Sequence, residues 1–156
     1  MQEKEAGLGA LSAIDCDFKV QEYREAEDGF FCNLLIAEFA GEYGHGARGN
    51  DDGVFMTAML RAGFSAWAPW VLVLDLAELR YEWGDMMESA LRAGEDYRPW
   101  DGGLATAVVA SPLNEAALRS LIDNVIGDDP DDWLRPSRDA AIAFALDKWR
   151  AKSPSG

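Results

Sequence analysis

The residues best suited to binding chemistry lie in a glycine-rich segment. Gly44-His-Gly-Ala-Arg-Gly49 fits the pattern G-x-G-x-x-G, with which dinucleotide-binding proteins bring backbone amides to a pyrophosphate. The pattern follows an apolar run of strand length, and Asp75 stands 26 residues after it, at the end of the next predicted strand. Asp51 and Asp52 follow the glycines, however, so the helix is expected to begin later, with carboxylates where phosphates would bind and only Arg48 to offset them. We therefore expect a loop before a capped helix, and no cofactor.

The chain has a single histidine, His45, which lies between two of these glycines. It has no partner at a spacing that would suit a metal, because nearby acids alone make a poor zinc site. We therefore expect an exposed loop histidine and no bound metal. The two cysteines, Cys16 and Cys32, form no disulfide framework, which favours a reducing cytoplasm.

A run of carboxylates follows the central apolar strand, where ligand crevices open in α/β sheets. These residues are Asp75, Glu78, Glu82, Asp85 and Glu88. Such a cluster would allow paired-carboxylate hydrolysis or binding of a divalent cation. Asp85 is also a suitable helix cap, and Glu88 has Arg92 four residues later, so a solvated acidic face is the favoured interpretation. No G-x-S-x-G motif is present, which argues against a serine hydrolase.

Six tryptophans are many for 156 residues. Four of them fall on element ends or apolar stripes and are expected in the core: Trp67, Trp70, Trp133 and Trp149. Trp83 and Trp100 occupy breaks between elements and are the candidates for exposure. An exposed tryptophan beside acidic groups is a common anchor of protein interfaces.

Composition excludes several classes of protein. The chain has 28 acidic and 14 basic side chains, a net charge of −14, which argues against binding to nucleic acids or to anionic membranes. Its 49% hydrophobic and 27% charged residues are typical of a globular domain rather than a disordered chain. No apolar run approaches the roughly 20 residues of a membrane span, and no secretory leader is expected.

The first half of the chain predicts a hairpin followed by a helix. Residues 18–23 alternate apolar and polar, Glu27-Asp28-Gly29 supplies a turn, and residues 30–42 form a long apolar run. The next helix is expected to have Asp51 or Asp52 as its N-cap and to end before Pro69. Its buried face is predicted to hold Phe55, Met59, Ala62 and Ala66.

The second half alternates strands and helices. Residues 70–76 and 104–110 are apolar at nearly every position, which predicts strands buried on both faces, and residues 133–134 suggest a short edge strand. Helices are expected from Asp85 to a stop at Gly94, from Ser111-Pro112, and from Pro136-Ser137.

This order predicts an α/β fold with a four- to five-stranded, mainly parallel mixed sheet that is opened by an antiparallel hairpin, with about four helices. We expect residues 1–17 to form a loose lead-in, residues 18–152 a single domain, and residues 153–156 a frayed tail.

Three segments carry a resemblance to a known family. They are Val71-Leu-Val-Leu-Asp-Leu-Ala-Glu-Leu-Arg-Tyr81, Ala105-Thr-Ala-Val-Val-Ala110 and Trp133-Leu-Arg-Pro-Ser-Arg-Asp-Ala-Ala-Ile-Ala-Phe-Ala-Leu146. With the hairpin and the glycine loop, residues 18–150 resemble the STAS domain, the fold of the bacterial anti-sigma-factor antagonists. The resemblance implies a non-catalytic interaction module. Those antagonists carry a serine or threonine after the central strand that is phosphorylated to switch off binding, whereas Tyr81-Glu-Trp-Gly-Asp-Met86 has neither residue.

We therefore expect a cytoplasmic, STAS-like regulatory module without the phosphoswitch, which binds a protein partner. The expected surface combines the glycine loop with the acidic run: Tyr43, His45, Arg48, Glu82, Trp83, Gly84, Asp85, Glu88 and Trp100. A homodimer is compatible with this expectation. One alternative is an acidic immunity or inhibitor protein that neutralises a basic toxin. The third is a small enzyme or nucleotide binder that uses the glycine loop or the carboxylates of residues 75–88.

Overall fold

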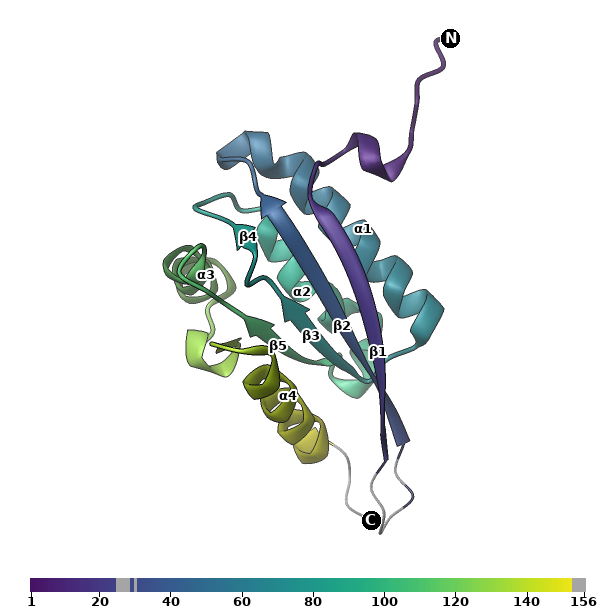
Figure 1. Cartoon of the computed structure of the whole chain (residues 1–156), viewed down its shortest axis with the longest axis vertical. Coiled ribbons are helices and arrows are strands. Elements are labelled where there is room, and N and C mark those ends of the chain that lie inside the picture. The colour runs from purple at the N-terminus through teal and green to yellow at the C-terminus, as the bar shows by residue number, and fades with distance from the viewer. Residues whose placement is uncertain (25–28, 30, 153–156) are drawn as a thin grey trace.

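The computed structural model describes residues 1–24, 29 and 31–152 and has an α/β architecture. Its mixed sheet has six strands, ordered β1-β2-β3-β5-β6, with the short strand β4 paired to the end of β2. Helices cover both faces, with α1 and α2 behind the sheet and α4 in front of it in Figure 1. The predicted fold class is confirmed.

The hairpin consists of β1 (Asp15–Arg24) and β2 (Phe31–Glu42), which pair antiparallel. β1 begins three residues before the predicted start at residue 18. The predicted turn residues Glu27 and Asp28 lie outside the described residues, as does the tail at 153–156, whereas Gly29 has the positive φ expected of a turn glycine, 65°.

The parallel part of the sheet contains β3 (Val71–Asp75) and β5 (Ala105–Val109), both buried along their whole length. This confirms the prediction from their continuous apolar runs, since strands with helices on both faces need no polar side. The edge strand β6 (Leu134–Arg135) pairs with the end of β5, close to the predicted place.

Four helices are described: α1 (Asn50–Trp67), α2 (Met87–Tyr97), α3 (Glu115–Leu121) and α4 (Arg138–Lys152). The first three bury their apolar side chains on one face of the sheet, and α4 covers the other face with Ala141, Ala145 and Trp149. Among the described residues, none of the helices is long and apolar enough to cross a membrane.

The buried face of α1 differs from the predicted one. Phe55 is buried as expected, but the rest of the face consists chiefly of Met56, Leu60 and Phe64, and both Ala62 and Ala66 are exposed. Burial of the larger side chains removes more apolar area from water than burial of two alanines would. The helix is therefore rotated toward Leu60 and Phe64.

Two predicted helix caps are wrong. Gly49 is the N-cap of α1, so Asp51 and Asp52 stand in its first turn, and Met86 rather than Asp85 is the N-cap of α2. The Asp52 carboxylate instead accepts hydrogen bonds from the Gly44 amide and from the Ser12 hydroxyl. The Asp52 side chain, which the local pattern predicted to cap the helix, thus binds donors that precede the helix.

Two further helix boundaries are displaced. Gly94 lies inside α2, which continues to Tyr97, and a β-carbon at Gly94 would be 3.0 Å from Thr106 Oγ1. The glycine therefore permits close packing on β5 rather than ending the helix. α3 begins at Glu115 instead of after Ser111, because the Ser111 hydroxyl donates to the Ala77 carbonyl and anchors the preceding turn to the end of β3.

Candidate functional site

The site begins with a strand that the sequence did not predict. β4 (Leu79–Arg80) pairs in parallel with Gly41 and Glu42 at the end of β2. The Gly41 amide donates to the Glu78 carbonyl at 3.1 Å, and the Tyr43 amide donates to the Arg80 carbonyl at 2.9 Å. The chain after β2 and the chain after β4 therefore run side by side.

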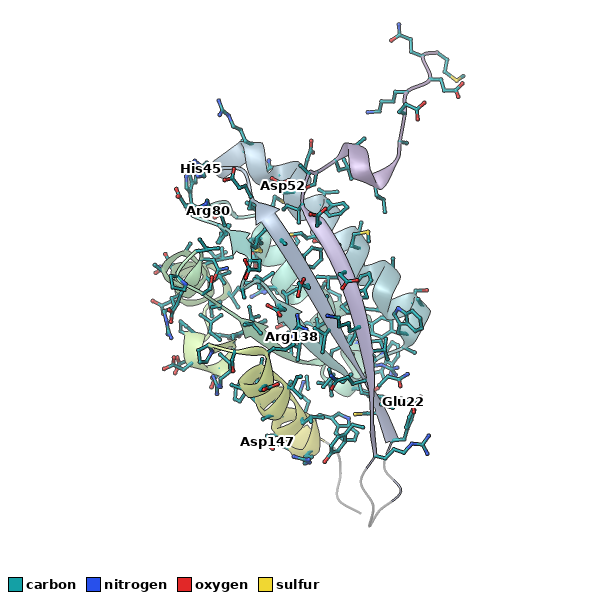
Figure 2. The ribbon with its side chains drawn as sticks, in the orientation of Figure 1. Glu22, His45, Asp52, Arg80, Arg138 and Asp147 are labelled. Atoms are coloured by element: carbon teal, nitrogen blue, oxygen red, sulfur yellow. The ribbon has the colours of Figure 1, made fainter. Side chains whose placement is uncertain are left out.

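This pairing brings the glycine loop to the break before α2. His45 Nε2 lies 3.1 Å from Glu82 Oε2, and the Gly46 amide donates to the Trp83 carbonyl at 3.3 Å. Figure 2 shows His45 and Arg80 at the same end of the molecule. Two segments almost 40 residues apart in sequence thus form one surface, as the sequence-based hypothesis required.

The indole of Trp83 rests on Gly46. A β-carbon at Gly46 would lie 2.4 Å from Trp83 Cη2, and Gly46 has a φ of 55°, in the left-handed region that favours glycine. Trp83 is nevertheless 61% exposed. The tryptophan is therefore supported on one side by backbone and presents the rest of its ring to solvent.

Two tyrosines lie in contact beneath this surface. Tyr43 and Tyr81 are buried and meet edge to face, with ring centroids 5.1 Å apart. The Tyr81 hydroxyl donates to the Gly84 carbonyl at 2.8 Å, and burial, with a smaller contribution from Asp85, raises the pKa of Tyr81 to about 12. Burial also raises the pKa of Tyr43, whose hydroxyl has no hydrogen-bond partner among the described residues.

Two carboxylates lie close to Trp83 in the chain, Glu82 and Asp85, and both are exposed. Glu42, also exposed, lies 3.8 Å from Arg80 Nε on the neighbouring strand end. Carboxylates this exposed keep most of their charge solvated and available to a partner. We call the group His45, Gly46, Glu82, Trp83 and Asp85 the Trp83 surface.

Within the glycine loop, backbone amides already donate within the protein. The Gly44 amide bonds Asp52 Oδ2 at 2.8 Å, and the Arg48 amide bonds the His45 carbonyl at 3.1 Å. Gly46–Gly49 forms a short 3₁₀ helix, and α1 follows directly at Asn50, so the predicted gap between the glycines and the helix is wrong. The Asp52 carboxylate nevertheless lies at the start of the helix, where a pyrophosphate would need positive potential.

Asp75 belongs to a different cluster from the rest of the acidic run. Its Oδ2 accepts a hydrogen bond from Arg138 Nε at 2.8 Å, its Oδ1 accepts from the Ala77 amide at 3.1 Å, and Arg138 also bonds Glu38. The hydrogen bond to Asp75 raises the pKa of Arg138 further above its usual range. Figure 2 places Arg138 apart from His45 and Asp52. Asp75 thus shares Arg138 with Glu38, which is not part of the acidic run, rather than pairing with another carboxylate of that run.

Most of the predicted surface residues are brought together, and a few are not. Arg48 adjoins the surface on the 3₁₀ helix, whereas Glu88 is half-buried in the first turn of α2 and pairs with Arg92 at 3.1 Å. Trp100 is 78% exposed but follows the far end of α2. The 11 residues of that helix separate it from Trp83 by roughly 16 Å.

Sequence reasoning missed Gly46, Arg80 and Tyr81 as parts of the site. Gly46 belongs to the glycine pattern, so the sequence indicated an unusual backbone conformation there. The sequence did not indicate that this glycine supports the indole of Trp83. Tyr81 had no signal, because its contacts depend on the pairing of β4 with β2. No group of three or more potential metal ligands occurs among the residues that the structure describes.

A cavity of about 380 Å³ opens beyond the carboxyl ends of β3, β5 and β6, the usual place for ligands in such sheets. Its charged lining residues are engaged with the protein. Arg119 pairs with Glu115 and Asp131, and Arg135 donates to the Asp131 carbonyl. These contacts stabilise the turn before β6. Both arginines are therefore already engaged within the protein rather than directed at a ligand.

No protein-family model matches the chain, and no curated protein sequence matches it.

Proposed function

We propose that this chain is a non-catalytic, STAS-like interaction module that binds a protein partner through the Trp83 surface. The observation that carries the proposal is the state of Trp83, which is 61% exposed yet held by Gly46 and by a backbone hydrogen bond. An exposed indole in a fixed position loses little conformational freedom on binding, and tryptophans of this kind are frequent hot spots of interfaces.

The charges around the indole favour a basic partner. Glu82 and Asp85 flank Trp83 in sequence and are exposed, within a chain of net charge −14. A lysine or arginine of a partner could lie over the indole face while it approaches these carboxylates. Complementary charge of this kind accelerates association and selects the partner.

The STAS resemblance supports the same region. The fold opens with an antiparallel hairpin. By the resemblance, the turn between β4 and α2 is the counterpart of the place where the antagonists carry their phosphorylated residue. Here that turn contains Glu82 and Asp85 instead of a serine or threonine. We infer that binding is constitutive and is not controlled by phosphorylation at this turn.

A quantitative affinity capture from the native cytoplasm tests the proposal. The bait is compared with Trp83→Ala, Asp85→Arg and, as matched control, Trp100→Ala, which removes a still more exposed tryptophan beyond the far end of α2. We expect a partner that is recovered by the parent and by Trp100→Ala but lost with the other two variants. With that partner purified, Trp83→Ala should raise Kd by roughly 30-fold or more, the loss typical of a hot spot. Equal recovery with all variants would refute the proposed surface.

The alternative of an immunity or inhibitor protein is favoured by the same acidic surface. It differs in the expected partner, a basic toxin, and in a strong salt dependence of the association rate. If a toxin gene lies beside the gene for this chain, co-expression of this chain should then protect cells from that toxin. The variant Asp85→Arg should fail to protect them. A partner encoded with a regulatory kinase or a sigma factor would favour the STAS-like module.

A further inference from the structure

β1 lies at a free edge of the sheet. It is the outermost strand on one side (Figure 1), and β2 is the only strand that pairs with it among the described residues. Over Asp15–Arg24, one row of backbone N–H and C=O groups pairs with β2, and a second row faces away from it. A row of this kind can pair with a further strand. Since strands are most often about 5–6 residues long, this edge is an unusually long template.

The edge is close to neutral, unlike the chain as a whole. β1 contains three acidic and two basic residues, a net charge of −1, whereas the whole chain has a net charge of −14. The acidic surfaces of two copies of this chain repel each other, because both carry the same excess of negative charge. A second copy therefore approaches the β1 edge against less repulsion than it meets at those surfaces.

The side chains of β1 alternate between the two faces of the sheet. Tyr23 lies on the face of α4, where its ring meets Trp149 edge to face. The other side chains in the same phase are polar: Asp15, Asp17, Lys19 and Gln21. The opposite phase, on the face of α1, includes the apolar side chains of Cys16, Phe18 and Val20. The strand thus has a polar pattern on one face and an apolar pattern on the other.

One symmetric register of two β1 edges brings opposite charges together. Two copies related by a two-fold axis pair antiparallel, and the residue on the axis meets its own copy. At least seven residues of each β1 can pair when the axis passes through a residue from 18 to 21. An axis at Phe18 places Asp17 opposite Lys19 of the second copy, and this pair occurs twice by symmetry. An axis at Lys19 opposes the two lysines, and an axis at Val20 or Gln21 leaves Lys19 opposite an uncharged side chain.

The other pairs in the register centred on Phe18 are compatible as well. Asp15 lies opposite Gln21 of the second copy, whose amide can donate to the carboxylate. On the other face, Cys16 lies opposite Val20 of the second copy, and Phe18 lies opposite its own copy, so apolar side chains meet apolar side chains. Val20, which is 36% exposed in the single chain, would then be covered.

The helix beside this edge leaves room for a second copy. Gly63 of α1 lies directly over Phe18, since a β-carbon there would be 2.9 Å from the Phe18 ring, and the neighbouring Phe64 contacts α2. Ala62 and Ala66 lie on the side of α1 away from α2 and are exposed, although the apolar pattern predicted their burial. Their small side chains allow a second copy to come close to the edge.

We propose that two copies of this chain form a homodimer through their β1 strands, which pair antiparallel with the two-fold axis at Phe18. The sheet then continues from one copy into the other, and the backbone groups that face away from β2 pair across the interface. Two ion pairs between Asp17 and Lys19 select the register, because like charges directly opposite each other are destabilising. No residue of the Trp83 surface belongs to β1, so this pairing does not depend on the proposed function.

Sedimentation equilibrium of the full chain tests this dimer and its register. We expect the parent chain to dimerise. Lys19→Asp opposes carboxylates and Asp17→Lys opposes lysines, so each single variant should raise the dimer Kd at least about tenfold. An equimolar mixture of the two variants restores both ion pairs in the mixed dimer and should dimerise like the parent. The double variant Asp17→Lys/Lys19→Asp restores both ion pairs as well and should also dimerise.

Lys4→Asp is the matched control, because it makes the same change of charge at an exposed residue outside β1. It should change the dimer Kd by less than about twofold, since its charge is screened from the interface. Asp17 and Lys19 are exposed in the single chain, so neither substitution disturbs the core.

Two results would overturn the proposal. A parent chain that remains monomeric at roughly millimolar concentration forms no such dimer, and Lys19 then protects the edge from pairing. A dimer whose Kd is unchanged by both charge reversals, or that the mixture fails to restore after the reversals have dissociated it, is not built on this register.

Discussion

Asp75 and Asp85 belong to the same acidic run but have opposite surroundings. Asp75 is buried at the end of β3, where Arg138 and the Ala77 amide bind its carboxylate. Asp85 is exposed beside Trp83. A buried carboxylate must be paired because the loss of its hydration is costly, whereas an exposed one needs no partner within the fold. The acidic run thus contains one structural carboxylate and a separate group that is available for binding.

The largest effect should come from unpairing the buried carboxylate. Arg138→Leu removes the cation that pairs with Asp75 and Glu38. The buried carboxylate of Asp75 then has no cationic partner, so the free energy of unfolding should fall by about 2–4 kcal/mol. Urea denaturation measures this change. Glu82→Gln on the Trp83 surface is the matched control and should change stability by less than about 0.5 kcal/mol. Equal losses in the two variants would contradict the division of the acidic run.

The support of Trp83 should give the next effect. Gly46→Ala places a methyl group against the indole and forces a non-glycine residue into the left-handed region. We expect a loss of about 2–3 kcal/mol, from about 1 kcal/mol of backbone strain and the displacement of Trp83.

Gly127→Ala is the control for the backbone strain, because Gly127 also has a positive φ, 82°, but open space around it. Its loss should be limited to about 1 kcal/mol, measured by the same urea titration. If the two alanine variants are equally destabilised, Gly46 does not support the indole.

Tyr81→Phe should have a smaller effect that depends on pH. Loss of the hydrogen bond to the Gly84 carbonyl should cost about 1 kcal/mol at neutral pH. The pKa of Tyr81 is raised from 10.0 to about 12 in the folded state, so the folded protein holds this proton more tightly than the unfolded chain. The resulting stabilisation is present below pH 10 and is lost as the pH rises toward 12.

Urea titrations at pH 8 and pH 11 should therefore show a shallower alkaline loss for Tyr81→Phe than for the parent. The loss should not vanish, because the pKa values of Tyr43 and Cys16 are raised by burial as well. An unchanged alkaline loss would show that Tyr81 ionises at its ordinary pKa.

The smallest effect is expected for Tyr43→Phe, at the ring that meets Tyr81 edge to face. The Tyr43 hydroxyl is buried without a hydrogen-bond partner among the described residues, so its removal forfeits no bond and should change stability by about 0 to +1 kcal/mol. Thermal or urea unfolding of both phenylalanine variants compares them directly. A marked destabilisation would mean that a bound water satisfies this hydroxyl.

Strands were easier to predict than helix ends, for a physical reason. The apolar runs around β3 and β5 are buried on both faces, and a continuous apolar run of strand length carries that burial in its own composition. Helix ends depend instead on single polar side chains. Asp52 accepts hydrogen bonds from the Gly44 amide and the Ser12 hydroxyl. The Ser111 hydroxyl donates to the Ala77 carbonyl while it accepts from the Leu113 amide, so each apparent cap also serves a contact outside its own helix end.

The site was predicted in part. The sequence indicated the glycine loop and the acidic run as one surface through a family resemblance, and the structure places His45 beside Glu82 and Gly46 beside Trp83. The resemblance did not separate Trp100 from this surface, because the length of α2 depends on where Gly94 packs. Nor did it indicate Tyr81, whose position follows from the pairing of β4 with β2.

The sequence by itself determined the α/β class, the order of the main strands and the excess of negative charge, because these follow from apolar periodicity and composition. Only the tertiary structure decided which carboxylates are neutralised, which tryptophan is exposed on a rigid support, and which lysine is half-buried. Each of these depends on neighbours contributed by other elements: Arg138 for Asp75, Gly46 for Trp83, and the Thr106 and Asp132 carbonyls for Lys148. Contacts between residues so distant in sequence leave no local pattern from which they could be predicted.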